Sequence, residues 1–270
     1  MSDLTPWAGR ADIRVFLEKS LADESPLVRS AAVRALSGLP GTGPLIRPLC
    51  EDPVRQVRLD AAWGLRDARD RKHSSYSELT EYLDAICDQP AGALRKAQFA
   101  LDEHRLEDAL KWSAKAASWD ATSGEAHQIH AVVLNTAGKT DEAMAELRKA
   151  CEVDPKNAQY PFMLALLCGE GGRLDEVIIQ LKRAVTLDPG FGRAWYNLGL
   201  ALAGKEQLDE SIKALLQAEE LLPGTPEVPY ARATVHARAG QIGEARKAAI
   251  RAQSLGSAPA GEMLKQLPPE

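Results

Sequence analysis

The stretch AWYNLGLALAGKEQLDES, residues 194–211, contains the pattern from which the fold follows. Its apolar residues have helical spacing, yet Gly199 stands inside the expected helix, where a glycine costs about 0.5–1 kcal/mol relative to alanine. That cost needs a compensating gain. Either a ligand approaches the backbone at Gly199, or a second helix packs closely against it. The rest of the chain distinguishes these alternatives.

The same pattern returns every 34 residues over the second half of the chain. Pro155, Pro189 and Pro223 have this spacing, and so do acidic pairs at 141–142, 175–176 and 209–210. The phrases RLEDA, KTDEA, RLDEV, QLDES and QIGEA begin at 105, 139, 173, 207 and 241. A fixed period of this length is typical of stacked helical units in a solenoid.

Small residues recur at the position of Gly199 in the other repeats, where the residues are Ala97, Ala131, Ala165 and Ala233. The second helices show the same feature at Ala116, Ala150, Ala184, Ala218 and Ala252. Small side chains are needed where paired helices approach closely. We therefore interpret Gly199 as a packing residue.

These repeats resemble tetratricopeptide repeats, in which each unit is a pair of antiparallel helices. The resemblance implies an all-α fold, an α-solenoid, with about five hairpins in 90–259. The expected units are 90–123, 124–157, 158–191, 192–225 and 226–259, and residues 260–270 are expected to form a C-terminal capping helix.

The first seventy residues follow a shorter repeat. LADESPLVRSAAVRALSGL (21–39) and LCEDPVRQVRLDAAWGLRD (49–67) align with an offset of 29 residues. They resemble two HEAT-type repeats within residues 1–70, followed by a linker and short helix at 71–89. In that family an arginine hydrogen-bonds an aspartate of its own or the adjoining turn. The resemblance implies that Asp52 binds Arg58 or Arg29, so these arginines are expected to be structural and not an anion site.

The order of the two repeat types resembles the C-terminal part of bacterial multihaem cytochrome c proteins. SPLVRSAAVRAL, DPVRQVRLDAAWGL and RAWYNLGLALA carry this resemblance. The chain has no Cys-x-x-Cys-His motif for haem attachment. We therefore expect no haem and no other cofactor in this chain.

Composition narrows the function classes further. A net charge of −5 argues against nucleic-acid binding, and four scattered cysteines argue against a disulfide framework or a zinc site. No apolar run reaches membrane-spanning length, so no membrane insertion is expected. The start, MSDLTPWAGRADIR, does not resemble a signal peptide. The chain is expected to be cytoplasmic if it is complete, and periplasmic if it is a fragment of an exported cytochrome.

Two motifs could indicate a nucleotide site or a metal site, but their positions in the repeats favour a structural role. AGKT (137–140) resembles the end of a phosphate-binding loop, but Val133 stands where that motif needs a glycine. His127 and His130 could both reach one metal ion, but they occupy helix-packing positions. We expect no metal site and no enzymatic activity. A bilin lyase, an activity of some HEAT-type proteins, stays as a minor alternative.

The leading hypothesis is a protein–protein interaction scaffold that binds a peptide or partner protein in the concave groove of the repeats. The fifth position of successive units holds Leu94, Gln128, Phe162, Tyr196 and Tyr230. Three of these are aromatic, and aromatic rings are enriched at binding hot spots. The predicted groove residues are Gln128, Phe162, Arg193, Tyr196, Tyr230 and Arg238.

Two alternatives remain open. The three rings are expected to be partly exposed in a shared concavity, but they could instead fill the core between helices. The chain could also be the repeat arm of a multihaem cytochrome, serving electron transfer without carrying haem itself.

Overall fold

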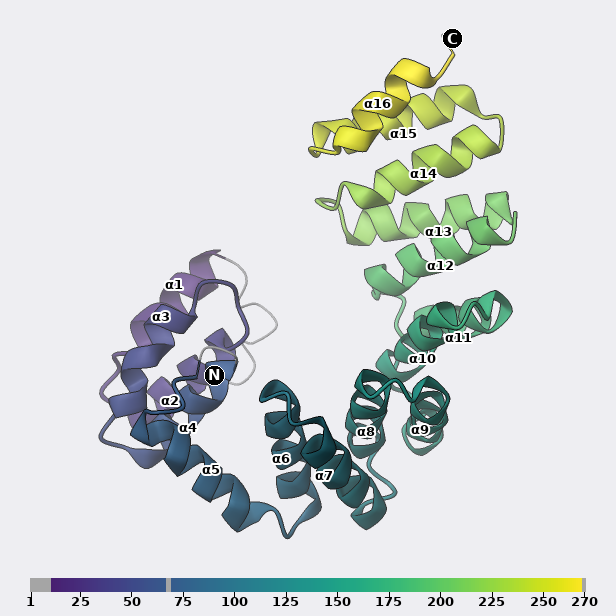
Figure 1. Ribbon diagram of the computed structural model, residues 1–270. Coiled ribbons are helices and arrows are strands. Elements are labelled where there is room, and N and C mark those ends of the chain that lie inside the picture. The colour runs from purple at the N-terminus through teal and green to yellow at the C-terminus, as the bar shows by residue number, and fades with distance from the viewer. Residues whose placement is uncertain (1–10, 67–68, 269–270) are drawn as a thin grey trace. The chain divides into compact units, whose positions relative to one another are not determined.

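The computed structural model describes residues 11–66 and 69–268, and these residues form helices and connecting turns without a β-strand (Figure 1). The expected all-α fold is confirmed. The chain divides into two compact units, Met1–Trp119 and Asp120–Glu270, called here the first and the second unit. Among the described residues, none of the helices has the length and apolarity to span a membrane.

The described part of the first unit consists of seven α-helices and one 3₁₀ helix. They are α1 (Ala11–Ser20), α2 (Pro26–Leu36), α3 (Gly43–Ile46), η2 (Arg47–Glu51, the 3₁₀ helix), α4 (Arg55–Gly64), α5 (Ser74–Ile86), α6 (Pro90–Asp102) and α7 (Leu106–Trp119). Leu17, Leu36, Ile46 and Val57 are buried in one core under α1 to α4. A second core, which includes Phe99, joins α4, α5 and α6.

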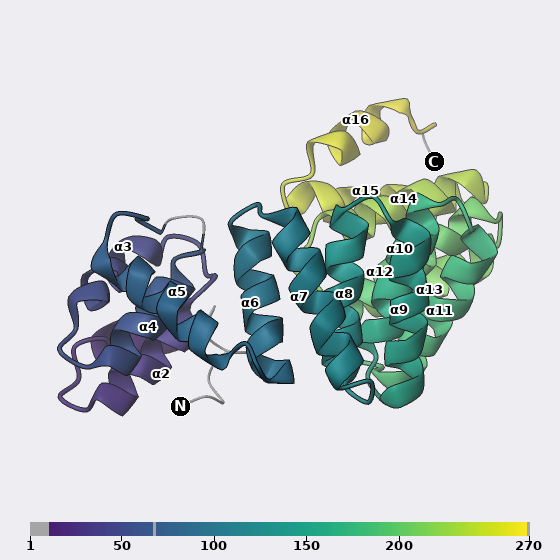
Figure 2. The same ribbon diagram turned by 60° about the horizontal axis from the view of Figure 1, so that its bottom comes forward.

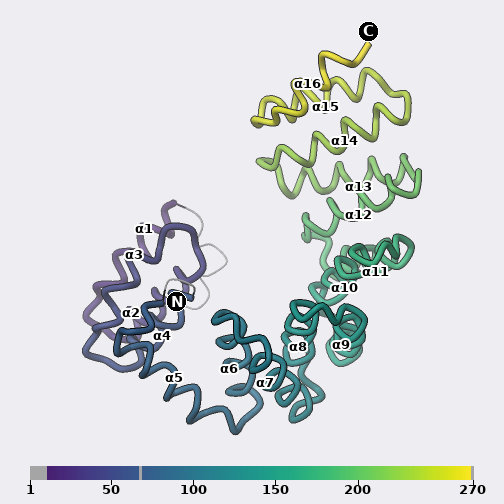
Figure 3. The backbone as a smooth tube through the Cα atoms, in the orientation of Figure 1, coloured from purple at the N-terminus to yellow at the C-terminus, as the bar shows by residue number. Residues whose placement is uncertain are grey.

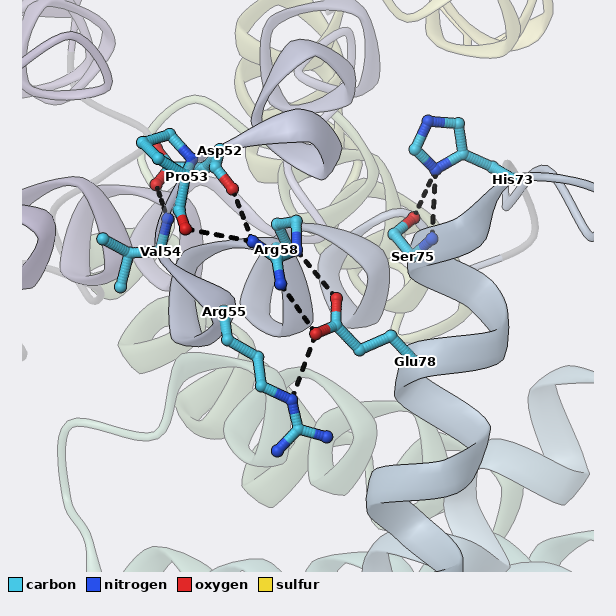
Figure 4. Close-up of polar contacts among 8 residues, drawn as sticks. All are labelled: Asp52, Pro53, Val54, Arg55, Arg58, His73, Ser75 and Glu78. Atoms are coloured by element: carbon cyan, nitrogen blue, oxygen red, sulfur yellow. Dashed lines mark hydrogen bonds and ion pairs between the residues drawn. The ribbon is translucent and has the colours of Figure 1, made fainter.

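Arginines connect successive turns of the first unit. Arg29 donates to both carboxylate oxygens of Asp52, at 2.7 and 2.9 Å, and to the carbonyl oxygen of Asp23 at 2.8 Å. Arg58 repeats this arrangement, donating to both carboxylate oxygens of Glu78 and to the carbonyl oxygen of Asp52, all at 2.8 Å (Figure 4). Bidentate pairs of this kind fix orientation as well as distance. The expected pairing of Asp52 with these arginines is confirmed.

The second unit is a run of four helical hairpins and a last helix. The hairpins are α8 (Gly124–Thr136) with α9 (Thr140–Val153), α10 (Gln159–Glu170) with α11 (Leu174–Leu187), α12 (Gly192–Gly204) with α13 (Leu208–Leu221), and α14 (Glu227–Arg238) with α15 (Ile242–Ser254). Each helix packs on the next in chain order, and short turns connect them (Figure 3). This is the stacking of an α-solenoid.

The last helix, α16 (Ala258–Gln266), lies against α15 at the end of the stack (Figure 2). Met263 and Leu264 pack on buried alanines of α14 and α15. The Ser257 hydroxyl accepts a hydrogen bond from the backbone N–H of Ala260, which caps the start of the helix.

The turn after the first helix of each hairpin has a left-handed residue at the same repeat position. Gly138, Gly172 and Gly240 have φ values of +75°, +69° and +73°, and His104 and Glu206 take φ values of +57° and +60° at the equivalent positions. These five residues are 34 apart in the sequence. Glycine adopts this conformation without the steric cost that a side chain incurs. The 34-residue repeat therefore appears in the backbone dihedral angles as well as in the sequence.

Gly199 lies at a close contact between α12 and α13. A Cβ atom at this position would lie 2.6 Å from Cγ of Leu215. The Ser211 hydroxyl also donates to the carbonyl oxygen of Gly199 at 2.7 Å. The interpretation of Gly199 as a packing residue is confirmed.

Candidate functional site

The six predicted groove residues all lie on the first helices of the hairpins in the second unit. Gln128 is on α8 and Phe162 is on α10. Arg193 and Tyr196 are on α12, while Tyr230 and Arg238 are on α14. Placement on equivalent helices follows from the 34-residue period, but the exposure of these side chains depends on what the neighbouring hairpins place against them.

The expectation that the Phe162 ring is partly exposed is wrong. Phe162 is only 2% exposed. The turn between α11 and α12 brings the Phe191 ring to a centroid distance of 4.7 Å. The guanidinium of Arg193 lies over the Phe162 ring, with its Cζ 5.6 Å from the ring centroid. Phe162 therefore fills the joint between two hairpins, with Arg193 covering it by a cation–π contact.

Tyr196 and Tyr230 are half-buried. Tyr196 packs against a buried cluster that includes Leu215 of α13 and Val235 of α14. Burial raises the pKa of the Tyr196 phenol. Both rings therefore present part of their surface to solvent, and the Tyr196 ring also contributes to helix packing.

Gln128 and Arg238 form contacts between neighbouring first helices. Gln128 Nε2 lies 3.2 Å from Sδ of Met163 on α10. Arg238 donates from Nη2 to the carbonyl oxygen of Ala203 at 2.8 Å and to the carboxylate of Glu206 at 2.7 Å. Arg238 thus adds a side-chain donor to the Ala203 carbonyl near the end of α12, which also accepts a hydrogen bond from the backbone N–H of Glu206 at 3.1 Å.

A hollow of about 240 Å³ lies between the first helices α8 and α10, and α9 contributes one residue to its lining. Buried Ala131, Leu147 and Leu167 form its floor, and Val132 and Leu166 stand beside them with exposed side chains. None of the six predicted residues lines this hollow.

Polar groups and the thioether of Met163 also line this hollow. Asn135 and Glu170 contribute an amide and a carboxylate, and Met163 is half-buried. Asn135 and Glu170 occupy the twelfth and thirteenth positions of their repeats, which are groove positions in the tetratricopeptide pattern. The hollow thus combines an apolar floor with polar groups that can orient a ligand.

Three exposed aliphatic residues share one repeat position. Val132 is 36% exposed, and Leu166 and Leu200 are each 40% exposed. They lie 34 residues apart on α8, α10 and α12. We call these three residues the aliphatic stripe. The sequence prediction missed it because the aromatic residues at the fifth position drew more weight, although the 34-residue recurrence of aliphatic residues at the ninth position could have revealed it.

His127 and Cys168 are candidates for a metal site or a reactive thiol, but each lies in a packed environment. His127 Nδ1 lies 2.6 Å from Oε2 of Glu146, and its Nε2 lies 3.0 Å from the carbonyl oxygen of Ala121. Burial raises the pKa of the Cys168 thiol to about 11, which disfavours the reactive thiolate. Within residues 11–66 and 69–268, no group of three or more His, Cys, Asp or Glu residues could hold a metal ion.

Comparison with known proteins identifies the repeats. Residues 124–157 and residues 180–226 each match a tetratricopeptide repeat model. No curated protein matches the sequence significantly.

Several solved structures have a similar fold. A MamA protein is 19% identical, with a TM-score of 0.58, and the match covers 62% of this chain and 91% of MamA. YrrB, described as a TPR protein with an unusual peptide-binding site, is 21% identical with a TM-score of 0.59, and the match covers 70% of this chain and 97% of YrrB. For pilF of Pseudomonas aeruginosa the identity is 24% and the TM-score 0.53, over 65% and 79% of the two chains. At these identities the likeness shows the fold alone. The chain is thus an α-solenoid that contains tetratricopeptide repeats, as its sequence predicted.

Proposed function

We propose that the chain is a non-enzymatic protein-interaction scaffold whose first-helix face in the second unit binds a segment of a partner protein. The observation that carries this proposal is the aliphatic stripe. Val132, Leu166 and Leu200 keep more than a third of their surface exposed at equivalent positions of three successive repeats. Exposed apolar side chains that form a series are typical of interaction surfaces, whereas single ones need no explanation.

The spacing of the stripe favours an extended ligand. Each of the first three hairpins of the second unit offers one aliphatic contact, so a partner segment that crosses their first helices would meet Val132, Leu166 and Leu200 in turn. The hollow between α8 and α10 can accept an apolar side chain, and Asn135 and Glu170 at its rim can bind polar groups. YrrB, which has a similar fold, is described as having a peptide-binding site, and this supports a peptide as the ligand.

The six predicted groove residues would contribute to the same surface. Tyr196 and Tyr230 would flank the stripe with half-exposed rings, and Gln128, Arg193 and Arg238 would supply polar groups at their edges. Phe162 would act from beneath, by holding Arg193 in position.

We further propose that the helices of residues 11–64 are HEAT-type repeats, since the Arg29 and Arg58 contacts repeat from one turn to the next. The domain bounds 1–70, 71–89, 90–259 and 260–270 stay a prediction. Neither the described residues nor the comparisons offer an observation that favours the cytochrome arm.

The experiment starts from the full chain as bait in its native host, with quantitative mass spectrometry to identify the partner. Calorimetry then compares the wild type with Leu166→Ser and Ile179→Ser. Both substitutions remove an exposed aliphatic side chain from the same hairpin, but Ile179 lies on α11, the second helix, and is 63% exposed. Leu166→Ser should weaken partner binding by about tenfold or more, as expected for a hot-spot residue.

Ile179→Ser should leave the affinity unchanged, because it lies outside the first-helix face. Equal affinity of both variants and the wild type would contradict the proposal. An equal loss in both variants would do so as well, because it would show a general effect of surface hydrophobicity. Thermal unfolding of each variant checks that the fold is intact.

A further inference from the structure

A second hollow lies within the first unit, among α2, α4, α5 and α6, with a volume of about 350 Å³. Leu59, Leu79 and Leu83 line it from the buried core. Trp63 and Tyr82 also line it, and both rings are half-buried. The volume lies at the small end of the range for binding pockets, about 300–1,000 Å³. A hollow of this size can hold one apolar side chain of a peptide together with parts of the residues next to it.

Three arginines line this hollow, so we call it the basic hollow. Arg34 comes from α2, Arg66 follows the end of α4, and Arg95 comes from α6. The side chains of Arg34 and Arg66 are 55% and 53% exposed, and Arg95 is also exposed. Three guanidinium groups from three parts of the fold meet here in a chain whose net charge is −5.

The carboxylates near the basic hollow are already engaged. Asp60 lies in its lining and accepts hydrogen bonds from Arg34 at 2.9 Å, from Gln56 at 3.2 Å and from the Ser30 hydroxyl. Asp60 thus already has three donors, and its only arginine partner among them is Arg34, so guanidinium N–H groups of the other two arginines are left to other acceptors.

The other two arginines are paired more loosely. Arg66 lies 3.6 Å from the Asp102 carboxylate, which is shared with Arg69 at 3.1 Å. Arg95 donates to the phenol oxygen of Tyr82 at 3.3 Å. The lining therefore has more positive than negative charge, and an added carboxylate could bind without displacing a strong internal ion pair.

We propose that the basic hollow binds an acidic segment of a partner polypeptide, in which an apolar side chain enters the hollow and flanking carboxylates bind the arginines. The buried leucines and the two rings favour the apolar anchor, and the arginines favour carboxylates on both sides of it. Asp60 beside the rings disfavours the dense negative charge of a nucleic-acid backbone. This binding site is separate from the aliphatic stripe and does not depend on the proposed function.

The test uses the full chain and three fluorescein-labelled peptides, with binding followed by fluorescence anisotropy. Their cores are EEFEE, which has both features, EESEE, which lacks the apolar anchor, and KKFKK, which reverses the charge. EEFEE should bind at least about tenfold more tightly than either of the others, and added salt should weaken it. Absence of EEFEE binding up to about 1 mM would overturn the proposal.

Matched variants separate a site from general charge attraction. Arg95→Glu should weaken EEFEE binding by about tenfold or more. Lys111→Glu makes the same change of net charge at an exposed position of α7 outside the basic hollow, and it should have little effect. Equal losses in the two variants would overturn the proposal, as would displacement of EEFEE by adenosine monophosphate at similar concentration. Circular dichroism confirms that both variants are folded.

Discussion

Gly199 and Leu215 set the distance between α12 and α13. The 2.6 Å that would separate a new Cβ from Leu215 Cγ is shorter than atoms tolerate, so this pair needs glycine despite its cost inside a helix. For Gly199 the structure agrees with the sequence prediction, whereas for Phe162 it does not. Its sequence position predicts a groove, but Phe191 and Arg193 cover it. The identity of a residue limits what it can do, and its neighbours decide whether it faces solvent.

Gly199→Leu should lower the free energy of unfolding by about 1–3 kcal/mol, because the larger side chain overpacks the contact with Leu215. Gly169→Leu is the matched control. Gly169 is also helical, but it is exposed, and the nearest atom to an added Cβ is Cγ2 of Val177 at 3.8 Å. The control should be neutral or stabilising by up to about 1 kcal/mol through helix propensity. Urea unfolding measures both, and equal destabilisation would show that close packing is not the cause.

Ion pairs connect the helices of the first unit more specifically than apolar contacts do. Hydrogen bonding to Arg29 holds the pKa of Asp52 below its usual value, and Arg58 does the same for Glu78. A carboxyl whose pKa is lowered by folding contributes stability that is fully present above its unfolded pKa. That contribution is lost as the pH falls through the folded pKa.

Asp52→Asn should therefore destabilise the protein most at neutral pH, because asparagine cannot form the ion pair with Arg29. The difference from the wild type should shrink as the pH falls below about 4, where the unfolded carboxyl becomes protonated. Denaturant midpoints at pH 7 and pH 3 measure this change. Glu24→Gln, at an exposed side chain near the same turn, is the control and should show a small difference at both values. A pH-independent effect of Asp52→Asn would contradict the linkage.

The whole molecule has two proposed binding surfaces, one in each of its two compact units. The aliphatic stripe lies in the second unit, and the basic hollow lies in the first. The first unit also contains α6 and α7, so the first hairpin of the 34-residue series clusters with the preceding helices. Repeat proteins gain stability from nearest-neighbour contacts, so a local substitution should act locally.

The two surfaces should consequently respond independently to substitution. Leu166→Ser should leave the binding of the EEFEE peptide unchanged, and Arg95→Glu should leave the binding of the stripe's partner unchanged. The double variant should show the sum of the single effects within about 0.5 kcal/mol for each ligand. Binding measured for all four chains tests this, and a cross-effect larger than that value would reveal coupling between the sites.

The sequence by itself determined the helical hairpins, their 34-residue register and the packing role of Gly199, because a repeat imposes the same local geometry and the same small contact residues in each unit. It also indicated the helices on which the candidate site lies. Only the tertiary structure decided which side chains of those helices reach solvent. Phe162 became core and Leu166 stayed exposed because exposure depends on side chains contributed by neighbouring hairpins. The basic hollow likewise combines arginines from three segments, and no local pattern in the sequence indicated that they would meet.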